Sequence, residues 1–156
     1  MTQLPFYLLA FVVVLGVLIV VHEFGHYLAA RYCGVRVLRF SVGFGRTLWQ
    51  RRLGKDGTEW AIGVFPLGGY VKMLDEREGE VTPAEQARAF NRQSVGKRSL
   101  IVAAGPCANF VLAIVLYWVV FMMGSNELLP ILGTPPVSSP AASAGIVNGE
   151  QVRGVD

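Results

Sequence analysis

The chain contains two long apolar segments separated by a polar stretch. Residues 4–21 carry no charge, and the helical pattern continues to about residue 31, while residues 100–124 contain no charged side chain at all. An α-helix rises about 1.5 Å per residue, so about 20 residues cross a hydrocarbon layer of about 30 Å. Both segments therefore predict transmembrane helices. No basic residue precedes the first one, which indicates a retained helix rather than a cleaved signal peptide.

The polar stretch between the two helices combines strand and turn signals. Residues 35–42 and 59–64 alternate between apolar and polar side chains, and glycine-containing turns follow them at 43–45 and 66–69. This pattern predicts a small β element whose apolar face keeps it close to the membrane. Residues 82–91 then begin with a capping box that has proline at the first helical position, which predicts a short helix.

Positive charge is concentrated between the two helices. Of 14 Lys and Arg residues, 13 fall between Arg31 and Arg98. The positive-inside rule therefore places this loop in the cytoplasm and the chain after Gly124 on the other side. Only 16% of the residues are charged, against about 25% in soluble domains. A net charge of +3, with the basic residues beside membrane segments, does not indicate a nucleic-acid partner.

Beyond the second helix the composition changes to proline, serine, glycine and other small residues. Residues 139–146 predict a short helix closed by Gly145, and residues 150–156 predict the start of a strand. About 30 residues are too few for an independent core, which usually needs about 40. We therefore expect the chain to end inside a domain.

The sequence HEFGH occupies residues 22–26, near the end of the first apolar segment. Four helical residues turn through about 400°, so His22 and His26 project about 40° apart on one face and can bind one metal ion. Glu23 lies close enough to act as general base for zinc-activated water that attacks a peptide carbonyl. The motif predicts a Zn²⁺ site with His22 and His26 as ligands and Glu23 as the catalytic residue.

The same spacing also arises by chance in buried helices, but three features favour a metal site. The two histidines are the only ones in the chain, the segment is independently predicted to be helical, and a charged Glu23 at membrane depth costs about 2.5–3.5 kcal/mol. A catalytic zinc usually has three protein ligands. Asp75 and Glu76 are formal candidates for the third, although acidic loops are more often solvated, and Cys33 is expected to be structural. Otherwise the third ligand lies beyond residue 156.

The second apolar segment contains GPCANF at residues 105–110. Pro106 deprives the carbonyl of Val102 of its usual helical donor, and Asn109 places an amide among apolar side chains. Transmembrane bundles tolerate both features, as a kink and as a polar bridge between helices. Alternatively, the amide holds an extended substrate backbone beside the metal. The residues alone leave both alternatives open.

Four segments, HEFGH, FSVGFG, PLGGYVKMLDE and AGPCANF, occur in this order. Together they resemble the site-2 protease family of intramembrane zinc metalloproteases, in its bacterial RseP-like branch (regulator of sigma-E protease). The resemblance implies that His22 and His26 are zinc ligands, that Glu23 is the catalytic base and that Asn109 binds substrate. It also implies that the third ligand is an aspartate in a later transmembrane helix, beyond residue 156.

With the predicted elements, the resemblance gives an α-helical membrane protein of four parts. Residues 1–33 are the first transmembrane helix with the zinc motif, and 34–98 are a cytoplasmic loop with a membrane-associated β element and a short amphipathic helix. Residues 99–125 are the second transmembrane helix, and 126–156 are the beginning of a periplasmic PDZ domain. The whole protein is expected to be multi-pass in the bacterial inner membrane, with its active site near the cytoplasmic side.

The function implied is regulated intramembrane proteolysis. Members of this family cut a transmembrane protein that another protease has already trimmed, typically an anti-sigma factor. The expected partners are that substrate and the lipid bilayer, and residues 1–156 alone are expected to be inactive. The alternative is a membrane-anchored PDZ-type binding module in which HEFGH is inert. A secreted soluble zincin is disfavoured because the motif lies inside the hydrophobic segment.

Overall fold

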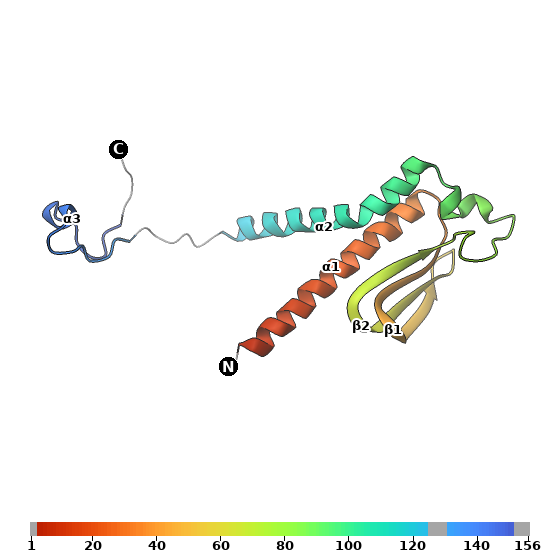
Figure 1. Cartoon of the computed structure of the whole chain (residues 1–156), viewed down its shortest axis with the longest axis horizontal. Helices are drawn as coiled ribbons and strands as arrows, with labels where there is room; N and C mark the ends of the chain where they lie inside the picture. Colours follow the sequence, from red (N-terminus) through yellow and green to blue (C-terminus); the bar gives the residue numbers. More distant parts are fainter. Residues whose placement is uncertain (1–2, 125–130, 152–156) are drawn as a thin grey trace. The chain divides into compact units, whose positions relative to one another are not determined.

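The computed structural model describes residues 3–124 and 131–151. Its elements, in chain order, are α1 (Leu4–Tyr32), β1 (Val37–Leu53), β2 (Thr58–Met73), the 3-10 turns η1 (Gln86–Arg88) and η2 (Phe90–Arg92), α2 (Val95–Met123) and α3 (Pro140–Ser143) (Figure 1). The chain divides into two compact units, and the boundary along the sequence falls within α2, between Tyr117 and Trp118. The candidate site lies in the first unit.

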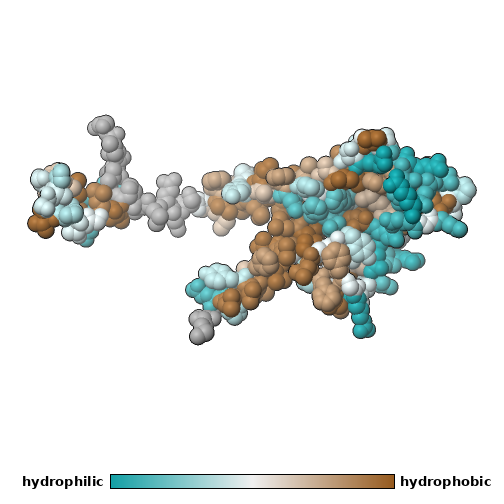
Figure 2. Space-filling model, viewed as in Figure 1, coloured by the Kyte–Doolittle hydropathy of each residue, from teal (hydrophilic) through white to brown (hydrophobic). Residues whose placement is uncertain are grey.

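The two long helices confirm the predicted transmembrane segments. Each has 29 residues and is long and apolar enough to cross a membrane. Large apolar side chains project outward along both, as brown surface in Figure 2, which is the arrangement that lipid-facing helices adopt. α2 begins at Val95, earlier than expected, so its first turns include the basic residues Lys97 and Arg98. The helix also continues through Pro106.

The β element is confirmed as a long antiparallel hairpin that folds back on itself. The first half of β1 lies between the two halves of β2. Phe40 is therefore opposite Trp60 on one side and opposite Val71 on the other. The second half of β1 pairs only with the first half of β2, where Arg51 lies opposite Trp60. The spatial order of the paired segments is therefore 69–73, 37–42, 58–62 and 47–53. Within the described chain, the outer side of segment 69–73 has no strand partner.

A cluster of aromatic rings fixes this sheet against α1. The Tyr27 ring centroid lies 5.2 Å from that of Trp60 and 5.8 Å from that of Phe40, and Phe40 and Trp60 lie 4.5 Å apart. Such pairs contribute about 0.5–1.5 kcal/mol each beyond their buried area. Since Tyr27 is one residue beyond His26, the cluster holds the sheet beside the metal motif.

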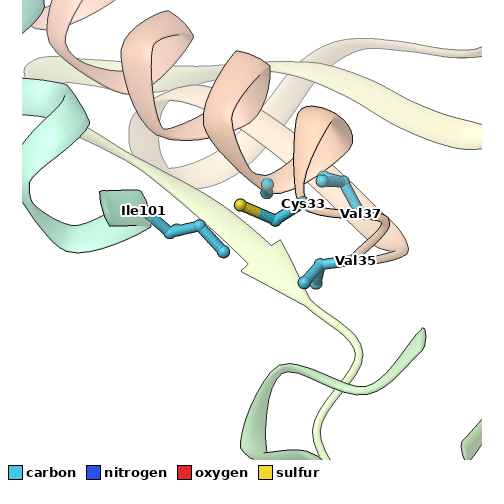
Figure 3. Packing of buried hydrophobic residues seen from close by; sticks show 5 residues of the cluster. Cys33, Val35, Val37 and Ile101 are labelled. Carbon is cyan, nitrogen blue, oxygen red and sulfur yellow. The ribbon is translucent and has the colours of Figure 1, made fainter. Parts of the chain in front are cut away.

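A small buried core joins the end of α1, the start of β1 and the first half of α2. Lys97 of α2 reinforces it, because its Nζ donates a 3.1 Å hydrogen bond to the carbonyl at the C-terminal end of α1. The core residues are Ala30, Cys33, Val35, Val37 and Ile101 (Figure 3). This core places the start of α2 beside the end of α1.

The predicted short helix at residues 82–91 is wrong. The segment instead forms the two 3-10 turns η1 and η2. The Thr82 hydroxyl donates to the Glu85 carboxylate rather than capping a backbone N–H, and the Phe90 N–H donates a 2.7 Å hydrogen bond to the carbonyl of Leu74. Tertiary backbone bonding to the end of β2 therefore replaces the helical hydrogen bonds that the local pattern favoured.

The second unit contains the short helix expected after residue 139. Ser139 caps α3 by accepting a 3.2 Å hydrogen bond from the Ala142 N–H, and Gly145 follows with a φ of +82°. Ile131 and Gln151 form an isolated antiparallel bridge. The expected strand at 150–156 lies mostly outside the described residues.

Candidate metal centre

The three chemical residues of the HEFGH motif lie together in the last part of α1. His22, Glu23 and His26 are all partly buried, and the two imidazole ring centroids are 4.9 Å apart. The helical register therefore brings both rings to one side of α1, as the four-residue spacing predicted.

A close helix crossing brings α2 to this side of α1. Gly25 lies at the crossing, where an added Cβ would collide with the carbonyl oxygen of Ala104 and lie 2.8 Å from the Cβ of Ala108. Only glycine at residue 25 permits the two backbones to approach this closely. The close crossing of the two helices therefore depends on glycine at residue 25, within the HEFGH motif.

Gly105 of α2 faces the two imidazoles. An added Cβ there would lie 2.7 Å from Nε2 of His22 and nearer still to Nε2 of His26. Both Nε2 atoms therefore pack against the backbone of α2 at Gly105. Gly105 is buried, and only a residue without a side chain fits against both rings at this position.

The two imidazoles are a donor set that fits a zinc ion. Zinc binds imidazole nitrogen at about 2.0–2.1 Å, and neighbouring carbonyls commonly hold the second ring nitrogen. Nδ1 of His26 lies 2.7 Å from the carbonyl oxygen of Ile101. A carbonyl only accepts, so Nδ1 carries the proton and Nε2 keeps its lone pair. His26 is thus oriented to bind a metal through Nε2.

Neither formal candidate for a third ligand is brought to the histidines. The Asp75 carboxylate accepts a 2.9 Å hydrogen bond from the Arg77 N–H. Glu76 accepts hydrogen bonds from Arg92 and Asn91, and these bonds hold the pKa of its carboxyl below the usual range. Across residues 3–124 and 131–151, no group of three histidine, cysteine or acidic residues is arranged to share a metal.

A groove leads from the sheet to Glu23. Its volume is about 380 Å³, and it is bordered by His22, Glu23 and Asn109 on the helices and by residues 67–69 of β2. β2 passes very close to the base, since an added Cβ on Gly69 would lie 2.8 Å from Cγ of Glu23. The groove joins mostly apolar walls to a few polar groups, as substrate sites commonly do.

Asn109 lies directly beside His22. The amide nitrogen is 3.4 Å from Nδ1 of His22, at the long end of the hydrogen-bond range, and Oδ1 is buried without a hydrogen-bond partner among the described residues. The contact joins α2 to α1 beside the metal motif, so both roles left open by the sequence remain predictions.

Sequence reasoning missed Gly105 and Ile101. The local signal at Gly105 is a glycine directly before Pro106, which does not indicate contact with the histidines. A backbone carbonyl such as that of Ile101 has no residue signature at all. Both contributions depend on where α2 crosses α1, which the sequence pattern does not specify.

Comparisons with known proteins give a consistent result. Residues 10–151 match peptidase family M50. The chain is 55% identical over 149 residues to the regulator of sigma-E protease RseP of Escherichia coli (strain K12), covering 96% of this chain and 33% of that protein. It is 50% identical over 155 residues to a putative zinc metalloprotease of Vibrio cholerae, covering 99% and 34% respectively. The chain thus spans about a third of the length of the curated relatives it matches.

Proposed function

Because the chain belongs to peptidase family M50, in the RseP-like branch of the site-2 proteases, we propose that it carries the catalytic motif of an intramembrane zinc endopeptidase. One observation carries the proposal: Nε2 of His22 and Nε2 of His26 lie together beside Gly105, and Glu23 borders the adjoining groove. Relatives from Vibrio cholerae and Xylella fastidiosa are named putative zinc metalloproteases, which supports zinc as the metal.

In this mechanism, His22 and His26 would hold the ion and Glu23 would move the proton. A bound zinc would supply Lewis acidity, which polarises the scissile carbonyl and makes water reactive at neutral pH. Glu23 would accept the proton of the attacking water and later return it to the leaving amine. The family resemblance implies that the third ligand is an aspartate in a later transmembrane helix of the full-length protein.

The open side of segment 69–73 supports binding of the substrate as an extended strand. A peptide bond in an intact helix is shielded, and lipid supplies no partners for the backbone of an unwound segment. Strand addition provides such partners, and this edge runs past Glu23 at Gly69. We propose that Asn109, which also lines the groove, contacts the same strand.

The wider role follows the family resemblance. We propose that the substrate is a pre-trimmed transmembrane protein of the anti-sigma-factor type, since the matched relative from Escherichia coli is named a regulator of sigma-E protease. The full-length protein would be multi-pass in the bacterial inner membrane, with the active site near the cytoplasmic side. Residues 126–156 would begin a periplasmic PDZ domain.

The test of this function is zinc-dependent cleavage. Purified full-length protein should cut a helical transmembrane substrate in detergent or liposomes, lose activity with a chelator and regain it with zinc. Residues 1–156 alone should not cut, because two histidines fall short of the three protein ligands of a catalytic zinc site. Absence of both bound zinc and cleavage in the full-length protein would favour the PDZ-type binding module with an inert HEFGH motif instead.

A second experiment tests the proposed topology. In full-length protein without its native cysteines, Gln50→Cys should react with maleimide only from the cytoplasmic side and Ser138→Cys only from the periplasmic side. Both positions are exposed. The basic loop that contains Gln50 resists translocation across the membrane, which keeps it in the cytoplasm. Labelling of the residue 138 site from the cytoplasm contradicts the assigned orientation.

A further inference from the structure

We propose that Asn109 is a positioning residue for His22: its amide oxygen accepts a hydrogen bond from Nδ1–H of His22 and thereby leaves Nε2 free for the metal. The inference rests on the proposed zinc site and adds a role for Asn109 beyond substrate contact. It starts from the hydrogen-bond neighbour that the described residues give His22, the amide of Asn109, and from the buried amide oxygen of the same side chain.

The first step concerns the tautomer that a metal ligand needs. A neutral imidazole carries one proton, so a ring that binds metal through Nε2 must hold that proton on Nδ1 and needs an acceptor there. For His26 the acceptor is the Ile101 carbonyl, 2.7 Å away. For His22 the described residues supply one neighbour at Nδ1, the Asn109 amide at 3.4 Å.

The second step concerns the direction of the amide. With Nδ2 facing His22, the amide would donate, Nδ1 would keep its lone pair, and the proton would occupy Nε2, where the metal must bind. The same orientation leaves Oδ1 of Asn109 buried without a partner, which costs about 1–3 kcal/mol. The two ends of an amide have nearly the same shape and are assigned from their hydrogen bonds. Exchanging them gives Oδ1 the Nδ1–H of His22 as a donor and frees Nε2, while the NH2 group takes the buried position and needs an acceptor there.

The third step is the spacing along α2. Ile101, Gly105 and Asn109 are four residues apart, so they lie on one face of the helix. The Ile101 carbonyl holds Nδ1 of His26, Gly105 allows both imidazoles to pack against the backbone of α2, and Asn109 lies beside Nδ1 of His22. One face of α2 thus serves both histidines, and Asn109 supplies by side chain what Ile101 supplies by backbone.

This arrangement is compatible with a contact to substrate. An amide whose oxygen accepts from His22 retains two N–H donors at its other end. Asn109 borders the groove that also contains Glu23 and Gly69. The same side chain can therefore orient the ligand and donate to a substrate carbonyl, and the two roles separate experimentally because only the first affects metal affinity in the absence of substrate.

The test measures zinc affinity of metal-free full-length protein by competition with a chromophoric chelator, without substrate. Asn109→Leu should weaken zinc binding about 10- to 100-fold, the usual cost of losing a partner of a metal ligand. Asn109→Asp keeps an acceptor and should stay within about threefold of the wild type. Phe110→Leu, at an exposed position of the same helix, should leave zinc affinity unchanged.

The outcomes separate this inference from the proposed function. Wild-type zinc affinity in Asn109→Leu overturns the positioning role but leaves the zinc site intact, whereas failure of the wild-type protein to bind zinc removes the site itself. Equal weakening in the Leu and Asp variants, with a matching fall in the melting temperature of the metal-free protein, also overturns it, because that result describes a bridge between helices. Rescue by Asp at unchanged melting temperature supports it.

Discussion

Replacing Glu23 with glutamine should abolish cleavage by the full-length protein while zinc remains bound. Glutamine has nearly the same size, so the close approach of Gly69 to this side chain is preserved, but an amide cannot accept the proton of the attacking water. Loss of a general base costs about 10²- to 10⁴-fold in rate. The ligand nitrogens belong to His22 and His26, which this substitution leaves unchanged. When both are measured on the same sample, the cleavage rate should therefore fall while the zinc content stays the same.

Three further variants complete this experiment. His22→Ala and His26→Ala should each lose zinc and activity together. Glu78→Gln is a matched control, because Glu78 is an exposed carboxylate that pairs with Lys72 away from the groove, and it should change neither quantity. Turnover at the wild-type rate in Glu23→Gln would assign the base to another residue.

Much of this arrangement was predictable from the sequence because the relevant signals are local. Apolar length alone identifies the two helices, and the four-residue spacing of His22 and His26 fixes both rings on one face once the helix is accepted. The alternation at 59–64 likewise identified a strand. Each of these inferences depends only on residues that are close in the sequence.

The remaining features depend on contacts between distant segments. The predicted short helix at 82–91 is absent because Phe90 bonds to Leu74, which no pattern within that segment reveals. The hairpin also folds back so that Phe40 pairs with both Trp60 and Val71. The alternation of apolar and polar residues along each strand does not predict this folding. The position of α2 at the histidines is likewise set by the tight crossing at Gly25, where the sequence shows only an unremarkable small residue.

The second large effect is expected at Gly105, where one added methyl group should eliminate tight zinc binding. In Gly105→Ala the new Cβ would lie 2.7 Å from Nε2 of His22 and closer to Nε2 of His26, so it would push both proposed ligand atoms out of position. Relief would require the rings to rotate or α2 to move away, and a shift of α2 would also disturb the Ile101 carbonyl that holds His26. We expect zinc affinity to fall at least about 100-fold, and cleavage with it, a loss of about 2.8 kcal/mol or more in binding free energy.

The chain offers a matched control in the same helix. Gly96 also lies in α2, but an added Cβ there would meet nothing within 4 Å. Gly96→Ala should keep wild-type zinc affinity and gain up to about 0.5–1 kcal/mol in stability, because alanine favours a helix over glycine. Zinc titration and thermal unfolding of both metal-free variants distinguish a blocked site from general unfolding. Wild-type zinc affinity in Gly105→Ala would show that the metal does not bind between these two Nε2 atoms.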